Sequence, residues 1–196
     1  VSAEIPVEKA PSNPTGLPYT DVAADSWYYE AVKYVTDQGI MNGTTPTTFS
    51  PMTTTSRAMI VTMLWRMEGS PVVNYRMDFT DVKEDAYYAE AVRWAASEGI
   101  VDGYEDGTFG PDKTVTREQM ATILYRYADT MGDNVAVSGN LNAYTDKDKV
   151  GSYAVTPMTW AVEHGIITGT TGTTLSPKST TTRAQVAVML HRYLTD

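Results

Sequence analysis

The sequence of 196 residues contains no cysteine and only two histidines, His164 and His191. Without cysteine the chain can form no disulfide bond, no thiolate zinc site and no cysteine nucleophile. Two histidines leave little material for a histidine metal site, and no catalytic triad, paired-carboxylate or phosphate-loop motif stands out. No apolar run approaches the ~20 residues of a membrane-spanning helix. We therefore expect no catalytic residue, no metal, no cofactor and no membrane insertion.

Positive charge is also scarce. The chain carries 15 Lys and Arg against 24 Asp and Glu, which gives a formal net charge of −9. This balance argues against a nucleic-acid partner, because phosphates must be neutralised by a basic surface. The hydrophobic fraction of 42% and the charged fraction of 20% are typical of a folded globular protein. A charged ligand must therefore be held by a few local positive groups.

Internal repetition organises the chain. Residues 19–67 align with residues 79–127, so that Gly39-Ile40 returns as Gly99-Ile100 and Arg57 returns as Arg117. A more divergent third copy contains Arg183 at the same place. Such repetition indicates that one structural unit is used several times. The predicted division is a Pro-rich linker at 1–18, repeat 1 at 19–67, a connector at 68–78, repeat 2 at 79–127, a Gly/Asn/Ser-rich connector at 128–143 and repeat 3 at 144–196.

Each repeat predicts two helices. The first covers Trp27–Gln38 in repeat 1 and Tyr87–Glu98 in repeat 2, with apolar residues at helical spacing and a glycine stop. In repeat 3 Pro157 predicts a kink or a start one turn late. The second helix follows a Gly/Thr-rich loop and a proline, and it is predicted at 57–67, 117–127 and 183–193.

The predicted fold class is all-α. A two-helix unit of about 50 residues cannot bury enough apolar surface by itself. We therefore expect three helix-loop-helix repeats that share one core with approximate three-fold symmetry, in a monomer that forms an internal pseudo-trimer. The aromatic residues Trp94 and Trp160 occupy one repeat position and are expected in this core.

An arginine begins the second helix of every repeat: Arg57, Arg117 and Arg183. The preceding Ser or Thr is an N-cap, and in repeats 2 and 3 a Gln completes a capping box. Capping does not explain the arginine, because a cation in the first turn opposes the helix dipole. Two interpretations are open. The guanidinium and the first-turn amides form an anion pocket, or the guanidinium forms a buried salt bridge between repeats, for instance to Asp21 or Asp81.

These motifs together resemble a tandem of three S-layer homology domains. The matching features are the [Phe/Tyr]-Thr-Asp-Val opening, the Gly-Ile-x-x-Gly element, the run Gly-Tyr-Glu-Asp-Gly-Thr-Phe-Gly-Pro at 103–111 and the arginine helix start. The resemblance implies a three-pronged spindle that attaches exported bacterial proteins non-covalently to the cell wall. It further implies a secondary cell-wall polysaccharide with pyruvylated N-acetylmannosamine as ligand, held in grooves between repeats with help from Arg57, Arg117 and Arg183.

Other groups are candidates for sugar contacts. The loop glycines Gly43, Gly103 and Gly169 could let backbone amides approach a ligand, or could serve turns that need a positive φ. Because repeat 3 departs furthest from the pattern, we expect Arg57 and Arg117 to bind more strongly than Arg183.

The expected function is that of a cell-wall anchoring module outside a bacterial cell, not an enzyme. Two alternatives are a protein–protein assembly module of a surface layer, which would use the same grooves without glycan binding, and a glycan-active enzyme, for which the sequence offers no convincing carboxylate pair.

Overall fold

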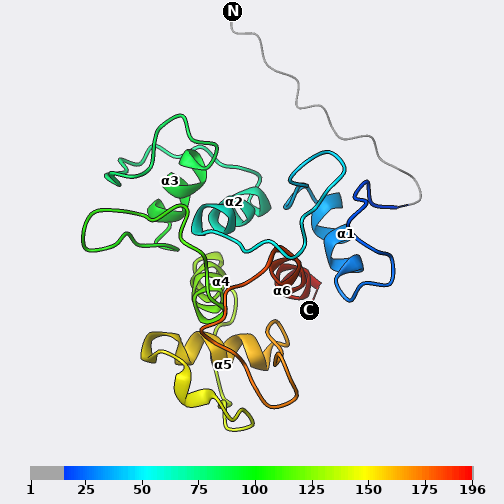
Figure 1. The fold of residues 1–196 in the computed structure, drawn as a ribbon. Coiled ribbons are helices and arrows are strands. Elements are labelled where there is room, and N and C mark those ends of the chain that lie inside the picture. Colours follow the sequence, from blue (N-terminus) through cyan, green and yellow to red (C-terminus); the bar gives the residue numbers. More distant parts are fainter. Residues whose placement is uncertain (1–15, 196) are drawn as a thin grey trace, which may run out of the picture.

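The computed structural model describes residues 16–195, and most of the predicted linker 1–18 lies outside this range. Three helix pairs surround a common centre, where α2, α4 and α6 lie, and loops extend outward as three lobes (Figure 1). One hydrophobic core includes residues from all three repeats. The predicted all-α fold with three repeats is confirmed. The helices are α1 (Tyr29–Asp37), α2 (Arg57–Met67), α3 (Ala89–Ser97), α4 (Arg117–Met131), α5 (Val155–Glu163) and α6 (Arg183–Thr195), with short 3-10 turns η1 (Lys147–Lys149) and η2 (Ser152–Ala154).

The helix pairs join one repeat to another. The second helix of each repeat packs against the first helix of the repeat that follows: α2 against α3, α4 against α5, and α6 back against α1. A repeat therefore buries its apolar face on its neighbour, and the last repeat closes the cycle on the first. The core consequently needs all three copies.

A ring of three backbone hydrogen bonds lies at the centre of this cycle. The amide of Thr55 donates to the carbonyl of Thr181 at 2.9 Å, Thr181 donates to Val115 at 2.8 Å, and Val115 donates to Thr55 at 3.0 Å. All three residues are fully buried. Because buried backbone groups need partners, the ring fixes the register in which the three helix starts meet.

Several predicted helix boundaries differ from the structure. Residues Trp27 and Tyr87 precede α1 and α3, so Trp27 does not belong to the apolar helical face. Helix α4 continues to Met131, into the predicted connector 128–143, and ends at Gly132 with φ 87°.

The prediction for Pro157 was wrong. Helix α5 starts at the repeat position where α1 starts, and Pro157 stands in its first turn. A first-turn residue has no intrahelical acceptor for its amide, so proline costs little there. The capping boxes are confirmed, with Thr116 paired with Gln119 and Thr182 paired with Gln185.

Candidate functional site

The three helix-start arginines hold backbone carbonyls of a neighbouring repeat. Each guanidinium donates from Nε to the carbonyl at the end of a Gly/Thr-rich loop and from Nη2 to a carbonyl near the start of that loop. The acceptors are Phe109 O at 2.9 Å and Asp102 O at 2.9 Å for Arg57, Leu175 O at 2.7 Å and Thr168 O at 2.7 Å for Arg117, and Phe49 O at 2.8 Å and Asn42 O at 2.6 Å for Arg183. The arginines therefore join repeat 1 to 2, 2 to 3, and 3 to 1.

Of the two interpretations left open for these arginines, the salt bridge to Asp21 or Asp81 was wrong. The Asp21 carboxylate instead accepts the amides of Phe49 and Ser50, at 2.8 and 2.7 Å. Asp81 accepts the corresponding amides of its own repeat. The loop end is thus held from both sides, because an aspartate takes its amide while an arginine takes its carbonyl.

Within residues 16–195, no carboxylate lies within 4 Å of the nitrogens of Arg57, Arg117 or Arg183. Arg117 and Arg183 are only 4% and 6% exposed. Burial lowers the pKa of all three guanidinium groups, although arginine stays protonated at neutral pH. Buried charges in proteins are normally paired, so three cations here remain without a counter-charge from this part of the chain.

The first-turn amides are already occupied. In α2 the amide of Arg57 donates to Lys113 O and that of Ala58 donates to Pro111 O, both at 3.0 Å. Helices α4 and α6 repeat this pattern with the next repeat in the cycle. The idea that these amides help to bind an anion was therefore wrong, since the neighbouring repeat takes them.

Two grooves reach this arrangement from the surface. The Arg183 groove has a volume of about 420 Å³, and the Arg117 groove has a volume of about 300 Å³. The Arg183 groove is lined by Met41, Asn42, Gly43, Thr44, Met59, Thr62, Met63, Arg66, Tyr87 and Arg183. The Arg117 groove is lined by Trp27, Arg117, Ile166, Ile167, Thr168, Gly169, Thr170, Gln185, Val188, Met189 and Arg192.

Every repeat contributes to each groove. In the Arg183 groove, repeat 1 supplies the loop and α2, repeat 2 supplies Tyr87, and repeat 3 supplies the arginine. The helix-start arginine therefore meets the loop glycine of another repeat: Arg183 meets Gly43, and Arg117 meets Gly169. Sequence alignment places corresponding residues in register but cannot reveal this cyclic pairing.

A second arginine stands in each groove. Arg66 donates to Ile40 O at 3.3 Å, and Arg192 makes contacts of 3.4 to 3.5 Å with Thr168 and Ile166. These residues sit near the C-terminal ends of α2 and α6, where the helix dipole favours a cation. Their repetition in register is visible in the sequence, but the helix dipole is enough to account for a cation there, so the sequence does not point to the grooves.

The groove aromatics come from the residue two positions before α1 or α3. Trp27 and Tyr87 are each 65% exposed. The other tryptophans serve the core, as expected for Trp94 and Trp160, which are 3% and 2% exposed. An exposed aromatic ring beside a hollow offers an apolar platform with little ordering cost.

The loop glycines are required by space and not by a positive φ. A Cβ at Gly43 would lie 2.4 Å from Thr45 O and 2.5 Å from a ring carbon of Tyr19. At Gly103 it would lie 2.4 Å from a ring carbon of Phe79, and Gly169 is equally crowded by its own loop. The positive φ values lie instead at glycines such as Gly39, at 71°. The alternative explanation by turn conformation was therefore wrong.

The described residues contain no group of three or more His, Asp or Glu that could hold a metal ion. Between residues 16 and 195 no helix combines the length and apolar character needed to cross a membrane.

Comparison with known proteins gives three matches in tandem. The family model described as S-layer homology domain matches residues 18–58, 78–121 and 143–187. An endoglucanase of Bacillus sp. (strain KSM-635) is 29% identical over 99% of this chain and 21% of its own length. The surface-layer 125 kDa protein of Lysinibacillus sphaericus is 32% identical over 83% of the chain and 14% of its own length. A cellulosome-anchoring protein of Acetivibrio thermocellus is 28% identical over 74% of the chain and 33% of its own length.

The chain thus spans about a third or less of the relatives it matches. The likeness to an endoglucanase covers only a fifth of that enzyme and includes the three repeats. The likeness therefore indicates that the two proteins share this module.

Proposed function

This chain belongs to the S-layer homology domain family, and from that premise we propose that it anchors a bacterial surface protein by gripping an acidic cell-wall polysaccharide in its inter-repeat grooves. The chain is extracellular and associated with the cell wall, as the tandem of three domains and the surface-layer relatives indicate. The anchoring role is supported by the same family matches.

The observation that carries the groove mechanism is the set of buried arginines without carboxylate partners. Arg183 uses Nε and Nη2 on carbonyls, and its Nη1 has no acceptor among residues 16–195. Arg66 stands in the same groove and contacts a single carbonyl. In a chain of net charge −9, two cations in one hollow favour an anionic group that neutralises both.

The groove suits a sugar that carries a carboxylate. A carboxylate can accept two parallel hydrogen bonds from a guanidinium. Beside it, Tyr87 or Trp27 presents an exposed ring on which the C–H face of a pyranose can stack. The ligand that best meets both demands is a pyruvylated N-acetylmannosamine unit, the ligand class implied by the family resemblance.

The structure favours a different ranking of the arginines from that expected from the sequence. Arg117 and Arg183 line the two grooves, and we propose these as the binding arginines together with Arg66 and Arg192. Gly43 and Gly169 line the same grooves, and their lack of a side chain lets the two sides of each loop approach closely.

Isothermal titration with native and chemically depyruvylated wall polymer tests the proposal. We expect binding to the native polymer and at least tenfold weaker binding to the depyruvylated one. Equal affinity for both would rule out the carboxylate mechanism.

A matched set of variants tests the residues. R66Q and R192Q each remove one of the two cations of a groove and leave the buried Arg183 and Arg117 in place. Their double variant is expected to lose binding. R76Q is the control, because Arg76 lies in the connector with a side chain that is 90% exposed. Unchanged binding by R66Q/R192Q would remove these two residues from the site.

Sedimentation at rising concentration separates the anchor from the assembly module. We propose a monomer, which retains purified wall polymer in a pull-down. Concentration-dependent self-association without polymer binding would favour the assembly module.

A further inference from the structure

The three-fold repetition predicts a third binding position around Arg57, but the residues there differ from those of the two grooves. By repeat register this position comprises Arg57, Gly103, Arg126 and Tyr153. At this position Arg57, Arg126 and Tyr153 each contact a side chain of the protein that has no counterpart in the two grooves.

The Arg57 guanidinium is covered by an aromatic side chain. Its carbon lies 5.2 Å from the centre of the Tyr104 ring and 4.7 Å from the centre of the Phe109 ring. The ammonium of Lys113 lies 3.6 Å from the same Tyr104 ring. Cation–π contacts of this kind stabilise a guanidinium that has no counter-ion.

In the two grooves a threonine stands where Tyr104 stands. Thr44 Oγ1 is 2.6 Å from Ser50 Oγ, and Thr170 Oγ1 is 2.7 Å from Ser176 Oγ, so each threonine side chain is held within its own loop. In repeat 2 the serine position is Gly110, where a Cβ would lie 2.9 Å from a ring carbon of Tyr104. The loop is therefore stabilised in two alternative ways: by a Thr–Ser hydrogen bond in repeats 1 and 3, and by the Tyr104 ring packed over Gly110 in repeat 2.

The second arginine is neutralised in repeat 2 only. Arg126 Nη1 is 2.8 Å from Asp102 Oδ2. The residues at the position of Asp102 in the other repeats are Asn42 and Thr168, which carry no charge. Arg66 and Arg192 consequently have no carboxylate within 4 Å among the described residues.

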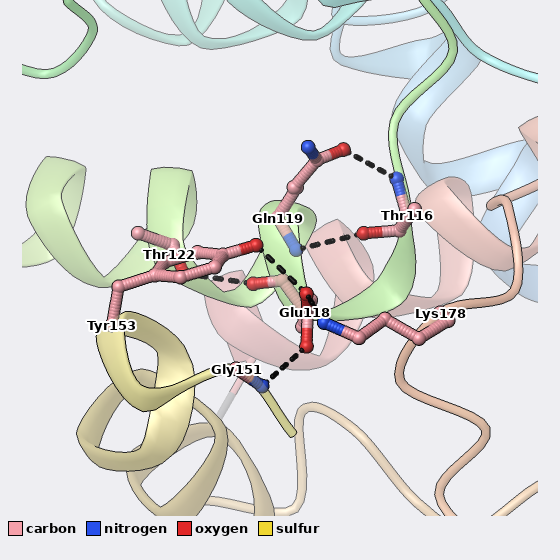
Figure 2. Close-up of polar contacts among 7 residues, drawn as sticks. All are labelled: Thr116, Glu118, Gln119, Thr122, Gly151, Tyr153 and Lys178. Carbon is pink, nitrogen blue, oxygen red and sulfur yellow. Dashed lines mark hydrogen bonds and ion pairs between the residues drawn. The ribbon is translucent and has the colours of Figure 1, made fainter. Parts of the chain in front are cut away.

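The hydroxyl of Tyr153 is also bonded within the protein, while its ring is 54% exposed. The Tyr153 hydroxyl donates to Glu118 Oε1 at 2.9 Å, while the same carboxylate accepts the Gly151 amide at 2.9 Å and the Lys178 ammonium at 2.5 Å. Figure 2 shows these donors converging on Glu118 at the start of α4. The residue at the position of Glu118 is alanine in repeats 1 and 3, so this anchor exists only at the third position.

We infer that the module binds two acidic sugar units and not three, because at the third position Tyr104 covers Arg57, Asp102 pairs with Arg126, and Glu118 holds the hydroxyl of Tyr153. This inference rests on the proposed function and specifies its stoichiometry. It also makes Tyr104 and Asp102 the residues that determine whether Arg57 is available to a ligand.

The first test needs no substitution. The wild-type chain is titrated with a methyl glycoside of pyruvylated N-acetylmannosamine, and amide resonances are followed by NMR. We expect a stoichiometry of two, with shifts at Thr44 and Thr170 and none at Tyr104. Three equivalent sites, or a shift at Tyr104 as large as at the two threonines, would overturn the inference.

The second test exchanges residues between repeats, to open the third position to a ligand or to close one of the two grooves. D102N/Y104T gives repeat 2 a neutral residue and a short side chain, and it is expected to raise the stoichiometry to three. T44Y/S50G places the repeat 2 pair in repeat 1, and it is expected to lower the stoichiometry to one. Y75T is the control, because Tyr75 is an exposed connector residue, and its stoichiometry stays at two.

The outcomes separate this inference from the proposed function. If D102N/Y104T still binds two units while its thermal unfolding remains cooperative, the gating role is wrong and the proposed function stands. If the wild-type chain binds no glycoside and no native wall polymer, the proposed function is wrong and the two-site inference is wrong with it.

Discussion

Replacing Arg183 by alanine should open the contact that closes the cycle of repeats. Arg183 joins repeat 3 to the loop of repeat 1 through hydrogen bonds of 2.8 Å to Phe49 O and 2.6 Å to Asn42 O. Its guanidinium also lies 4.5 Å from the centre of the Phe49 ring. These contacts span 134 and 141 positions of sequence, so no local structure can replace them.

The size of the effect follows from the two bonds and their burial. A hydrogen bond to a charged group contributes about 1.5–3 kcal/mol. In R183A the carbonyl of Phe49 loses this charged donor, and because Phe49 is fully buried the loss is costly. Relief from burying an unpaired guanidinium offsets part of this loss. We expect R183A to lower the free energy of unfolding by about 3–5 kcal/mol, a large fraction of the ~5–15 kcal/mol typical of a domain.

Urea unfolding followed by circular dichroism and by tryptophan fluorescence measures this loss. R183K keeps the charge but only one bonding direction, so an intermediate loss is expected. R66A is the control, since Arg66 contacts one carbonyl at 3.3 Å, and we expect a loss below about 1 kcal/mol. If R183A and R66A unfold at the same urea concentration, the reasoning that guanidinium groups hold the repeats together is refuted.

Three further changes test other parts of the structure. E118Q removes the carboxylate shown in Figure 2. Burial raises the pKa of Glu118, but the hydrogen bonds that its carboxylate accepts lower it by more, so the pKa lies below its ordinary value. The advantage of wild type over E118Q should therefore be present at pH 7 and vanish as the pH falls through the lowered folded-state pKa, and a gap in urea midpoint that is constant from pH 7 to about pH 3 would contradict this. G43A should lower the melting temperature, since its Cβ would meet Thr45 O at 2.4 Å, whereas G172A, with nothing within 4 Å, should leave it unchanged; equal calorimetric scans would show that space is not the reason. W27A should leave unfolding unchanged and weaken retention of wall polymer several-fold, because Trp27 is 65% exposed in the Arg117 groove, and full retention would exclude stacking there.

The sequence predicted those helix ends well that are fixed by hydrogen bonds or backbone conformation within a few residues. The Ser or Thr cap and the Gln three residues later define the starts of α4 and α6, because that hydrogen-bond pattern is complete within four residues. Gly39 and Gly99 end α1 and α3 with a φ of 71°. Pro157 misled because its effect depends on its position within the helix, and that position is set by the packing of α5 on α4.

The candidate site was predicted in its residue types but not in its partners. Repetition against the helix dipole singled out Arg57, Arg117 and Arg183, and the structure gives each of them two carbonyl acceptors at corresponding repeat positions. Which carbonyls these are depends on the neighbouring repeat, and nothing in a linear alignment specifies a cyclic order. The same limit hid Tyr87, whose exposure follows from its position just before α3.

By itself the sequence determined the class of the molecule: three copies of one unit too small to fold alone, a chain without cysteine that needs a shared core, and three cations placed in register. Those features depend on composition, periodicity and local hydrogen bonding, which act over a few residues or through total apolar surface. Only the tertiary structure decided that each arginine serves the next repeat and that the first-turn amides are already taken. It also decided that Tyr104 covers Arg57, that Asp102 pairs with Arg126 and that Glu118 accepts from Tyr153. The reason is physical, because these outcomes depend on contacts between residues some 25 to 140 positions apart and on which buried groups remain without a counter-charge once those contacts have formed.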